Sequence, residues 1–204
     1  MKIVGFTCDG ASVNTGKNRG VIKLMQEEVH DKVVLVHCLV HRLELAYKKA
    51  FQSSKLYDQV ISLLTRLFSF YHVSPLQRQN YASTCEALQV TAAYPVRIGG
   101  TRWLSHTESG LTILWKGYKA FVEHLQQVVV GAPGSTRSNA QPKAKAIVQQ
   151  LRSWDQMWFA CFLHDVLTIL GRLCKELQSQ DCSISSCHQL LRATTNSIKK
   201  LKER

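Results

Sequence analysis

Two segments of the chain have the composition of β-strands, and a helical pattern lies between them. The first, residues 2–8, ends at the turn-forming pair Asp9-Gly10, and the second, residues 32–37, is almost continuously apolar. Between them, residues 18–29 carry apolar side chains at helical spacing. This order predicts a βαβ unit with parallel strands. The continuous apolar run is typical of a strand buried on both faces.

After this unit the pattern is helical. Apolar stripes predict helices over residues 38–51, 55–72, 75 to about 92, 107–130, from Pro142 towards Leu177, and 184–202. On the longest stripe we expect Trp154, Trp158 and Phe159 in the core. Two strands with one helix leave sheet faces uncovered. We therefore predict a mainly α protein with a small, incomplete parallel β portion in residues 1–40, and a helical domain in 41–204 with a loop at 131–142.

The formal net charge of +12 is spread along the chain, since each quarter of the sequence is net positive. A basic globular domain attracts polyanions, and nucleic acid is the commonest polyanion inside cells. The cysteines number seven, an odd count that favours a reducing compartment such as the cytosol or nucleus. No uninterrupted apolar run approaches the roughly 20 residues that span a bilayer, so we expect no membrane partner.

Asp9 has two interpretations. It follows a strand at the edge of a parallel sheet where ligands gather, and a carboxylate there suits Mg²⁺. Alternatively, it caps the turn that it begins with Gly10, as Asp-Gly pairs often do. The loop that follows resembles a phosphate loop, but five residues separate its glycines where the P-loop has four. A helix N-terminus with Lys17 beside it can still contact a phosphate.

Two further groups bring together side chains that can carry chemistry. Cys38 and His41, which follow His37, can share a helix face and bind a metal, or they can pack as ordinary structural residues. Arg102 and Trp103 follow a glycine break. Arg can grip a phosphate and Trp can stack on a base, or the Trp can anchor the start of a helix in the core.

Taken in order, these motifs resemble those of hAT-superfamily transposases. The resemblance rests on Cys8-Asp9-Gly10-Ala11-Ser12 with Thr15-Gly16-Lys17 and Gly20, on His37-Cys38-x-x-His41-Arg42 with Leu45-Ala46, and on Thr101-Arg102-Trp103-Leu104-Ser105. The chain is especially similar to the transposase-derived, zinc-finger-associated nuclear proteins of vertebrates, over about residues 1–125.

The resemblance implies an RNase H-like fold with three acidic metal ligands and a helical domain inserted between the second and third. Asp9 matches the second acid, and Cys38 and His41 match a Cys-x-x-His motif near the active site. Arg102 and Trp103 match an Arg-Trp pair of the insertion, whose Trp is implicated in handling a flipped base. The first acid, the third acid and the N-terminal zinc finger have no match. We therefore expect a partial RNase H-like segment that lacks a complete set of catalytic carboxylates.

These features together predict a domesticated or degenerate transposase-like fragment in the nucleus that binds DNA without sequence preference. The expected DNA contacts, chosen for charge and stacking chemistry, are Lys17, Arg19, Arg42, Arg102 and Trp103. Mg²⁺ is expected at Asp9 only where missing parts complete the site. One alternative is a nuclear scaffold for a protein partner or a second copy, with no nucleic-acid role. Another is a residual metal-dependent nuclease centred on Asp9.

Overall fold

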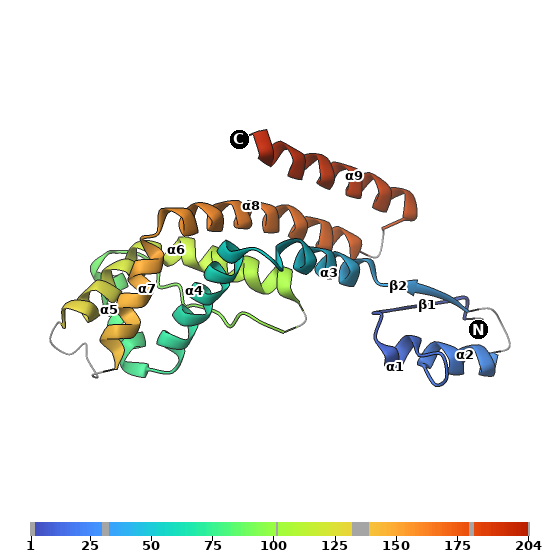
Figure 1. Cartoon of the computed structure of the whole chain (residues 1–204), viewed down its shortest axis with the longest axis horizontal. Coiled ribbons are helices and arrows are strands. Elements are labelled where there is room, and N and C mark those ends of the chain that lie inside the picture. The colour runs from blue at the N-terminus through green and yellow to red at the C-terminus, as the bar shows by residue number, and fades with distance from the viewer. Residues whose placement is uncertain (1–2, 30–32, 101, 132–138, 180–181, 204) are drawn as a thin grey trace.

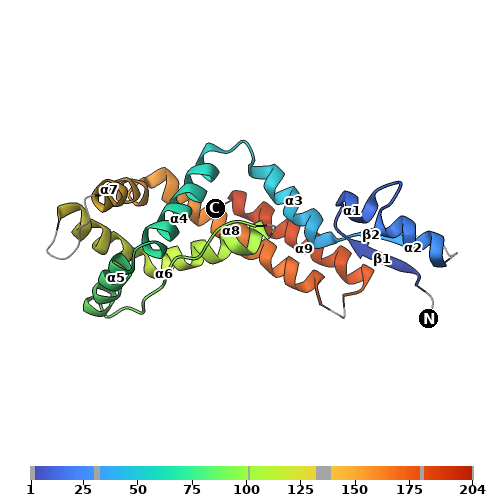
Figure 2. The ribbon, with the colours of Figure 1, turned by 90° about the horizontal axis from the view of Figure 1, so that it is seen from below.

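A two-stranded parallel sheet with two helices lies at one end of an elongated molecule, and a helical bundle forms the rest (Figures 1 and 2). The computed structural model describes residues 3–29, 33–100, 102–131, 139–179 and 182–203. The predicted fold class, mainly α with a small parallel sheet, is confirmed. The elements are β1 (Gly5–Cys8), α1 (Ser12–Thr15), α2 (Val21–Val29), β2 (Val34–His37), α3 (Leu39–Phe51), α4 (Lys55–His72), α5 (Pro75–Ala87), α6 (Trp103–Val130), α7 (Ala140–Leu151), α8 (Trp154–Leu177), α9 (Ile184–Lys200) and a 3-10 turn (Leu201–Glu203).

The βαβ unit, residues 3–37, has a small core of its own. Its strands pair in parallel from Gly5 opposite Val34 to Cys8 opposite His37. Cys8, Ile22 and Val33 are buried and lie outside the hydrophobic cluster of the bundle. The Gln26 side chain donates a hydrogen bond of 3.0 Å to the Val33 carbonyl, which ties α2 to the start of β2.

The prediction that the second strand is buried on both faces is wrong. Val34, Leu35 and Val36 keep 59%, 42% and 47% of their surface exposed. A continuous apolar run shows that these residues favour burial, but burial requires elements on both faces of the sheet. In the part of the chain that the structure describes, α2 contributes Ile22 to the small core and leaves most of β2 uncovered.

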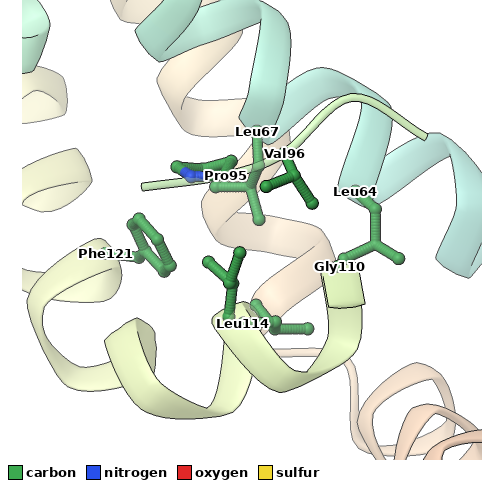
Figure 3. A pocket seen from close by; sticks show the side chains of 8 residues that line it. Leu64, Leu67, Pro95, Val96, Gly110, Leu114 and Phe121 are labelled. Atoms are coloured by element: carbon green, nitrogen blue, oxygen red, sulfur yellow. The ribbon is translucent and has the colours of Figure 1, made fainter. Parts of the chain in front are cut away.

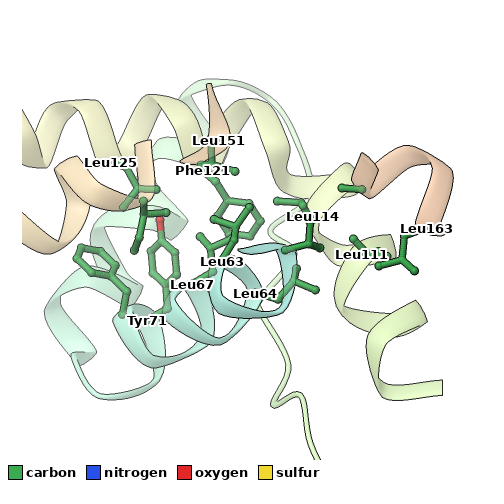
Figure 4. Packing of buried hydrophobic residues seen from close by; sticks show 14 of the residues in the cluster. Leu63, Leu64, Leu67, Tyr71, Leu111, Leu114, Phe121, Leu125, Leu151 and Leu163 are labelled. Carbon is green, nitrogen blue, oxygen red and sulfur yellow. The ribbon is translucent and has the colours of Figure 1, made fainter. Parts of the chain in front are cut away.

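The bundle, α3 to α9, encloses one large hydrophobic core (Figure 4). Leu63 of α4, Leu111 and Phe121 of α6, and Leu163 of α8 are fully buried there. The core includes a polar contact between two helices, because the buried His124 ring lies 3.0 Å from the Tyr71 hydroxyl. Burial lowers the pKa of His124 to about 4.

Several helix boundaries differ from the predicted ones. The predicted helix from Pro75 to about residue 92 ends at Ala87, and Gln89 follows with a φ of 55° that breaks the helix. The predicted continuous helix from Pro142 to Leu177 is two helices, α7 and α8, separated by Arg152 and Ser153.

The predicted loop at 131–142 ends earlier than expected, because the next helix already begins at Ala140. Gly131 closes α6 with a φ of 80°, the left-handed conformation that favours glycine. α7 begins at Ala140, and Pro142 lies in its first turn, where a proline is tolerated. The remainder of this predicted loop, residues 132–138, lies outside the described residues.

By length and composition alone, α8 is long and apolar enough to cross a membrane, and 33% of its most apolar stretch is buried. The apolar stretch of α8 is not an uninterrupted run in the sequence, because polar residues such as Asp165 interrupt it. The buried residues of α8, among them Ala160, Leu163 and Leu167, belong to the bundle core.

The expectation that the aromatic residues near the start of α8 belong to the core is wrong for two of the three. Phe159 packs against the core cluster, but Trp154 and Trp158 are exposed. Residues 154 and 158 lie close together on a helix surface, since four residues complete slightly more than one turn. Residue 159 lies about 100° further round, which carries its side chain towards the core.

Candidate functional site

Asp9 caps the turn that follows β1. Its Oδ1 accepts hydrogen bonds from the Asn14 side-chain amide at 2.8 Å and from the Ala11 backbone amide at 3.2 Å. These hydrogen bonds, with the nearby His41 and His37, hold the pKa of Asp9 below its usual value. The carboxylate is therefore ionised at neutral pH, and the turn-capping interpretation of Asp9 is confirmed.

Two histidines gather with Asp9 at the carboxyl ends of the strands. His37 ends β2 and His41 lies in the first turn of α3, with 5.8 Å between their ring centroids. A Cβ on Gly10 would lie 3.2 Å from the His37 ring, so a larger residue there would crowd the imidazole. His37 Nε2 is buried and has no hydrogen-bond partner among the residues that the structure describes. The parallel register brings these groups together, since both strands end at one edge.

This set fits Mg²⁺ poorly. Mg²⁺ prefers several oxygen ligands, whereas this edge offers one carboxylate, with Oδ1 already engaged by two donors, beside two imidazoles. Within the described ranges, no group of three or more His, Cys, Asp or Glu side chains is arranged to hold a metal ion. Burial raises the pKa of Cys174 of α8 to about 11, with smaller contributions from nearby Glu44, Glu108 and Cys38.

Glu44 connects α3 to the start of α6. The Leu104 backbone amide donates a hydrogen bond of 2.9 Å to Glu44 Oε2, and residue Glu44 is 6% exposed. Burial raises the pKa of Glu44, and the hydrogen bonds from the Leu104 and Trp103 amides oppose that shift. Arg102 supplies no side-chain cap to α6. Glu44 performs this role from another helix, and α6 accordingly begins at Trp103, earlier than the predicted residue 107.

Trp103 of α6 lies beside Lys48, a cation of α3, the helix that also carries Glu44. The Lys48 ammonium is 4.5 Å from the Trp103 ring centroid, and the ring packs against the bundle core. His41, Glu44 and Lys48 follow one another at helical spacing and form what we term the linking face of α3. This face connects Asp9 at the sheet edge to the first turn of α6. Sequence reasoning missed Glu44 and Lys48, although their spacing from His41 is the signal that relates them.

The predicted DNA contacts do not form one patch. Trp103 lies with Lys48, whereas Arg42 lies on a different side of α3 from the linking face. Lys17 and Arg19 lie in the turn between α1 and α2. Of the predicted contacts, the four cations Lys17, Arg19, Arg42 and Arg102 are exposed. Thr101, which belongs to the third motif, lies outside the described residues.

Two hollows among the described residues are candidate ligand sites. The first, between α4, α6 and the segment at Pro95 and Val96, is an apolar cavity of about 10 Å³ (Figure 3), room for about one water molecule. The second is an open cleft of about 530 Å³ between the end of α8 and α9. It contains Cys182, whose sulfur lies 3.2 Å from that of Cys187. Neither hollow adjoins Asp9 or Arg102.

The junction of the sheet edge, α3 and the start of α6 is therefore the candidate site. It combines an ionised turn carboxylate, two histidines and exposed arginines with a half-buried Trp. In comparisons with known proteins, no protein-family model matches the chain and no solved structure matches it.

Proposed function

We propose that the chain is a domesticated or degenerate relative of hAT transposases that binds the phosphate backbone of DNA without sequence preference. The partial RNase H-like identity of residues 1–40 and residence in the nucleus belong to the same proposal. Two observations support it: the ordered motifs of the sequence, and the position of Asp9 at the carboxyl end of a parallel strand.

Exposed positive charge without local neutralisation is the observation that carries the proposal. Among the described residues, Lys23 and Glu27 form an ion pair of 3.3 Å, and neither Arg42 nor Arg102 has one. The net charge of the chain is +12. Unpaired cations attract phosphates and release the counterions condensed on DNA, which drives binding that does not depend on base sequence.

Lys48 and Trp103 extend this interface at the start of α6. An exposed cation such as Lys48 gains about 0.5–1 kcal/mol from lying over an aromatic ring, so the half-buried Trp103 ring holds Lys48 weakly in place. In our proposal Lys48 contacts a phosphate together with Arg102, and Trp103 positions Lys48. Trp103 packs against the core cluster, which supports this positioning role better than stacking on a base.

The proposed function is not catalytic. Strand transfer by a two-metal mechanism requires carboxylates that hold both ions across the attacking and leaving oxygens. Asp9 is the one carboxylate that the motifs match, and its Oδ1 is engaged in the turn. We therefore propose binding to DNA in place of cleavage.

Fluorescence anisotropy with labelled double-stranded DNA, titrated at several salt concentrations, tests this proposal. We expect the logarithm of the binding constant to fall linearly with the logarithm of salt concentration. In the double variant Arg42→Ala with Arg102→Ala, we expect the magnitude of the slope to fall by about 2, because two phosphate contacts are lost.

The matched control is Lys143→Ala with Lys145→Ala. Both lysines are exposed on α7, at the end of the bundle opposite the sheet (Figure 1), and this variant loses the same charge. If both variants lowered the magnitude of the salt slope equally, the sheet end would not be the DNA interface. A folded protein that does not bind DNA at low salt would overturn the proposal. Nicking of supercoiled DNA that requires Mg²⁺ and disappears in Asp9→Asn would overturn its non-catalytic part.

A further inference from the structure

Three aromatic side chains form an exposed stripe on α8. Trp154, Trp158 and Phe162, which we term the aromatic stripe, are 77%, 63% and 37% exposed. They are spaced four residues apart and so are neighbours on the helix surface. Contiguous exposed apolar surface of this kind marks an interaction site.

The remainder of the bundle does not cover this stripe. The opposite side of α8 is buried in the core through Leu163 and Leu167. α9 packs along α8 (Figures 1 and 2) and turns Ile198 towards the core cluster, yet both tryptophans stay exposed. Burying a Trp side chain in an interface gives one of the largest gains in binding free energy that a single residue can provide.

Charges beside the stripe indicate which partner it fits. Asp155 and Asp165 are exposed on α8, and Arg152 is exposed just before the helix begins. The two carboxylates repel nucleic acid and anionic membranes. An arginine near one end and a carboxylate near the other instead suit a partner with the opposite order of charges.

The stripe is nearly symmetric about Trp158. Trp154 lies four residues before Trp158 and Phe162 four after it, while Arg152 lies six before and Asp165 seven after. If two copies of α8 pack antiparallel with a two-fold axis at Trp158, Trp154 meets Phe162 of the second copy. The same axis places Arg152, which precedes α8, within one residue of the position opposite Asp165 of the second copy at both ends. A two-fold interface needs this kind of self-complementary surface.

We propose that the chain forms a homodimer through the aromatic stripe, with two copies of α8 antiparallel and Arg152 of each copy paired with Asp165 of the other. The dimer is independent of DNA binding, because the stripe and the junction at α6 share no residue. Trp158 lies at the centre of the interface, where a buried aromatic residue contributes most to affinity.

Sedimentation velocity of the full chain over about 1–200 µM tests the dimer, for which we expect a dissociation constant on the order of 10 µM. Trp158→Ser raises this constant by at least about 30-fold, because it removes the central aromatic contact. Val130→Ser is the control: Val130 is apolar and exposed at the end of α6, outside the stripe, and its replacement leaves the constant unchanged. Circular dichroism verifies that both variants are folded.

Charge reversal tests the antiparallel register. Arg152→Glu and Asp165→Lys each weaken the dimer by roughly three- to tenfold, and the double variant restores it, because the pair is re-formed with opposite sign. A chain that stays monomeric at the highest concentration overturns the proposal, as does a dimer insensitive to Trp158→Ser. Failure of the double variant to recover overturns the register. Binding of the monomer to neutral phosphatidylcholine vesicles, with a blue shift of Trp emission, assigns the stripe to a lipid surface and overturns the homodimer.

Discussion

The two ends of the molecule contain similar proportions of apolar side chains but differ in how much of them is buried. In the bundle, Leu63, Leu111 and Phe121 are fully buried among neighbours from several helices. In the βαβ unit, Cys8, Ile22 and Val33 are buried, while Val34 and its neighbours in β2 stay exposed. Apolar composition therefore favours an element, whereas a core requires enough elements to surround it.

This comparison also concerns stability. A two-stranded sheet is marginal by itself in water, so the βαβ unit depends on its few buried contacts and on its attachment to α3. The bundle buries many more side chains and carries most of the free energy of folding. We expect the two regions to respond differently to substitution and to pH.

The largest expected effect is in the bundle core. Phe121→Ala removes a fully buried ring that stacks on Tyr81 with 4.8 Å between centroids, and it lowers the free energy of unfolding by about 3–5 kcal/mol. Urea unfolding followed by Trp fluorescence measures it. The matched control Phe162→Ala, at a partly exposed position of α8, changes the free energy by less than about 1 kcal/mol at low protein concentration. Equal losses in the two variants would contradict the assignment of the core.

A second effect distinguishes the bundle by its response to acid. Burial depresses the pKa of His124 to about 4, so the folded protein binds this proton less readily than the unfolded chain does. The contribution to stability is complete above about pH 6.5 and is lost as pH falls towards 4, by roughly 2–3 kcal/mol. Urea unfolding at pH 7 and pH 4.5 measures this loss. His124→Phe should reduce this loss of unfolding free energy, whereas His188→Gln, at an exposed position of α9, should retain it. If His124→Phe lost as much stability in acid as the unmodified chain, groups other than His124 would be responsible for the acid sensitivity.

The smallest expected effect is confined to the βαβ unit. Ile22→Ala removes a buried side chain from its small core and destabilises the unit by about 2 kcal/mol. Hydrogen exchange of residues 3–29 should accelerate by roughly 30-fold while exchange in the bundle core is unchanged, because the unit opens by itself. Leu24→Ala, on the exposed part of α2, is the control. Equal acceleration in the bundle core would show that the two regions unfold together.

The sequence predicted elements with strong local patterns well and long-range contacts poorly. The apolar stripe of α4 predicted its bounds to the residue, and the Ser54 side chain caps its first turn at 3.3 Å. The parallel pairing of the strands also followed from the order of elements. By contrast, α6 begins at Trp103 because Glu44 caps it from 60 positions away, and no pattern around Arg102 reveals that.

Burial was the weaker part of the sequence reasoning for a physical reason. Periodicity shows that Trp154 and Trp158 share a helix face, but it does not show whether that face meets the core or water. The same limit applies to the candidate site, where local order is predictable from the sequence and packing between helices is not. The strand order brought Asp9 near His37, whereas Lys48 beside Trp103 depends on how α3 packs against α6.

The direct passage from β2 into α3 has a thermodynamic consequence. β2 ends at His37, α3 begins at Leu39, and Cys38 between them donates its backbone amide to the Cys8 carbonyl at 2.8 Å. No flexible linker separates the sheet edge from the helix that caps α6. A ligand that touches both would meet a preorganised surface and would lose little conformational entropy in aligning its two halves. Such a surface can use a few weak contacts effectively, since little of their free energy is spent on ordering the protein.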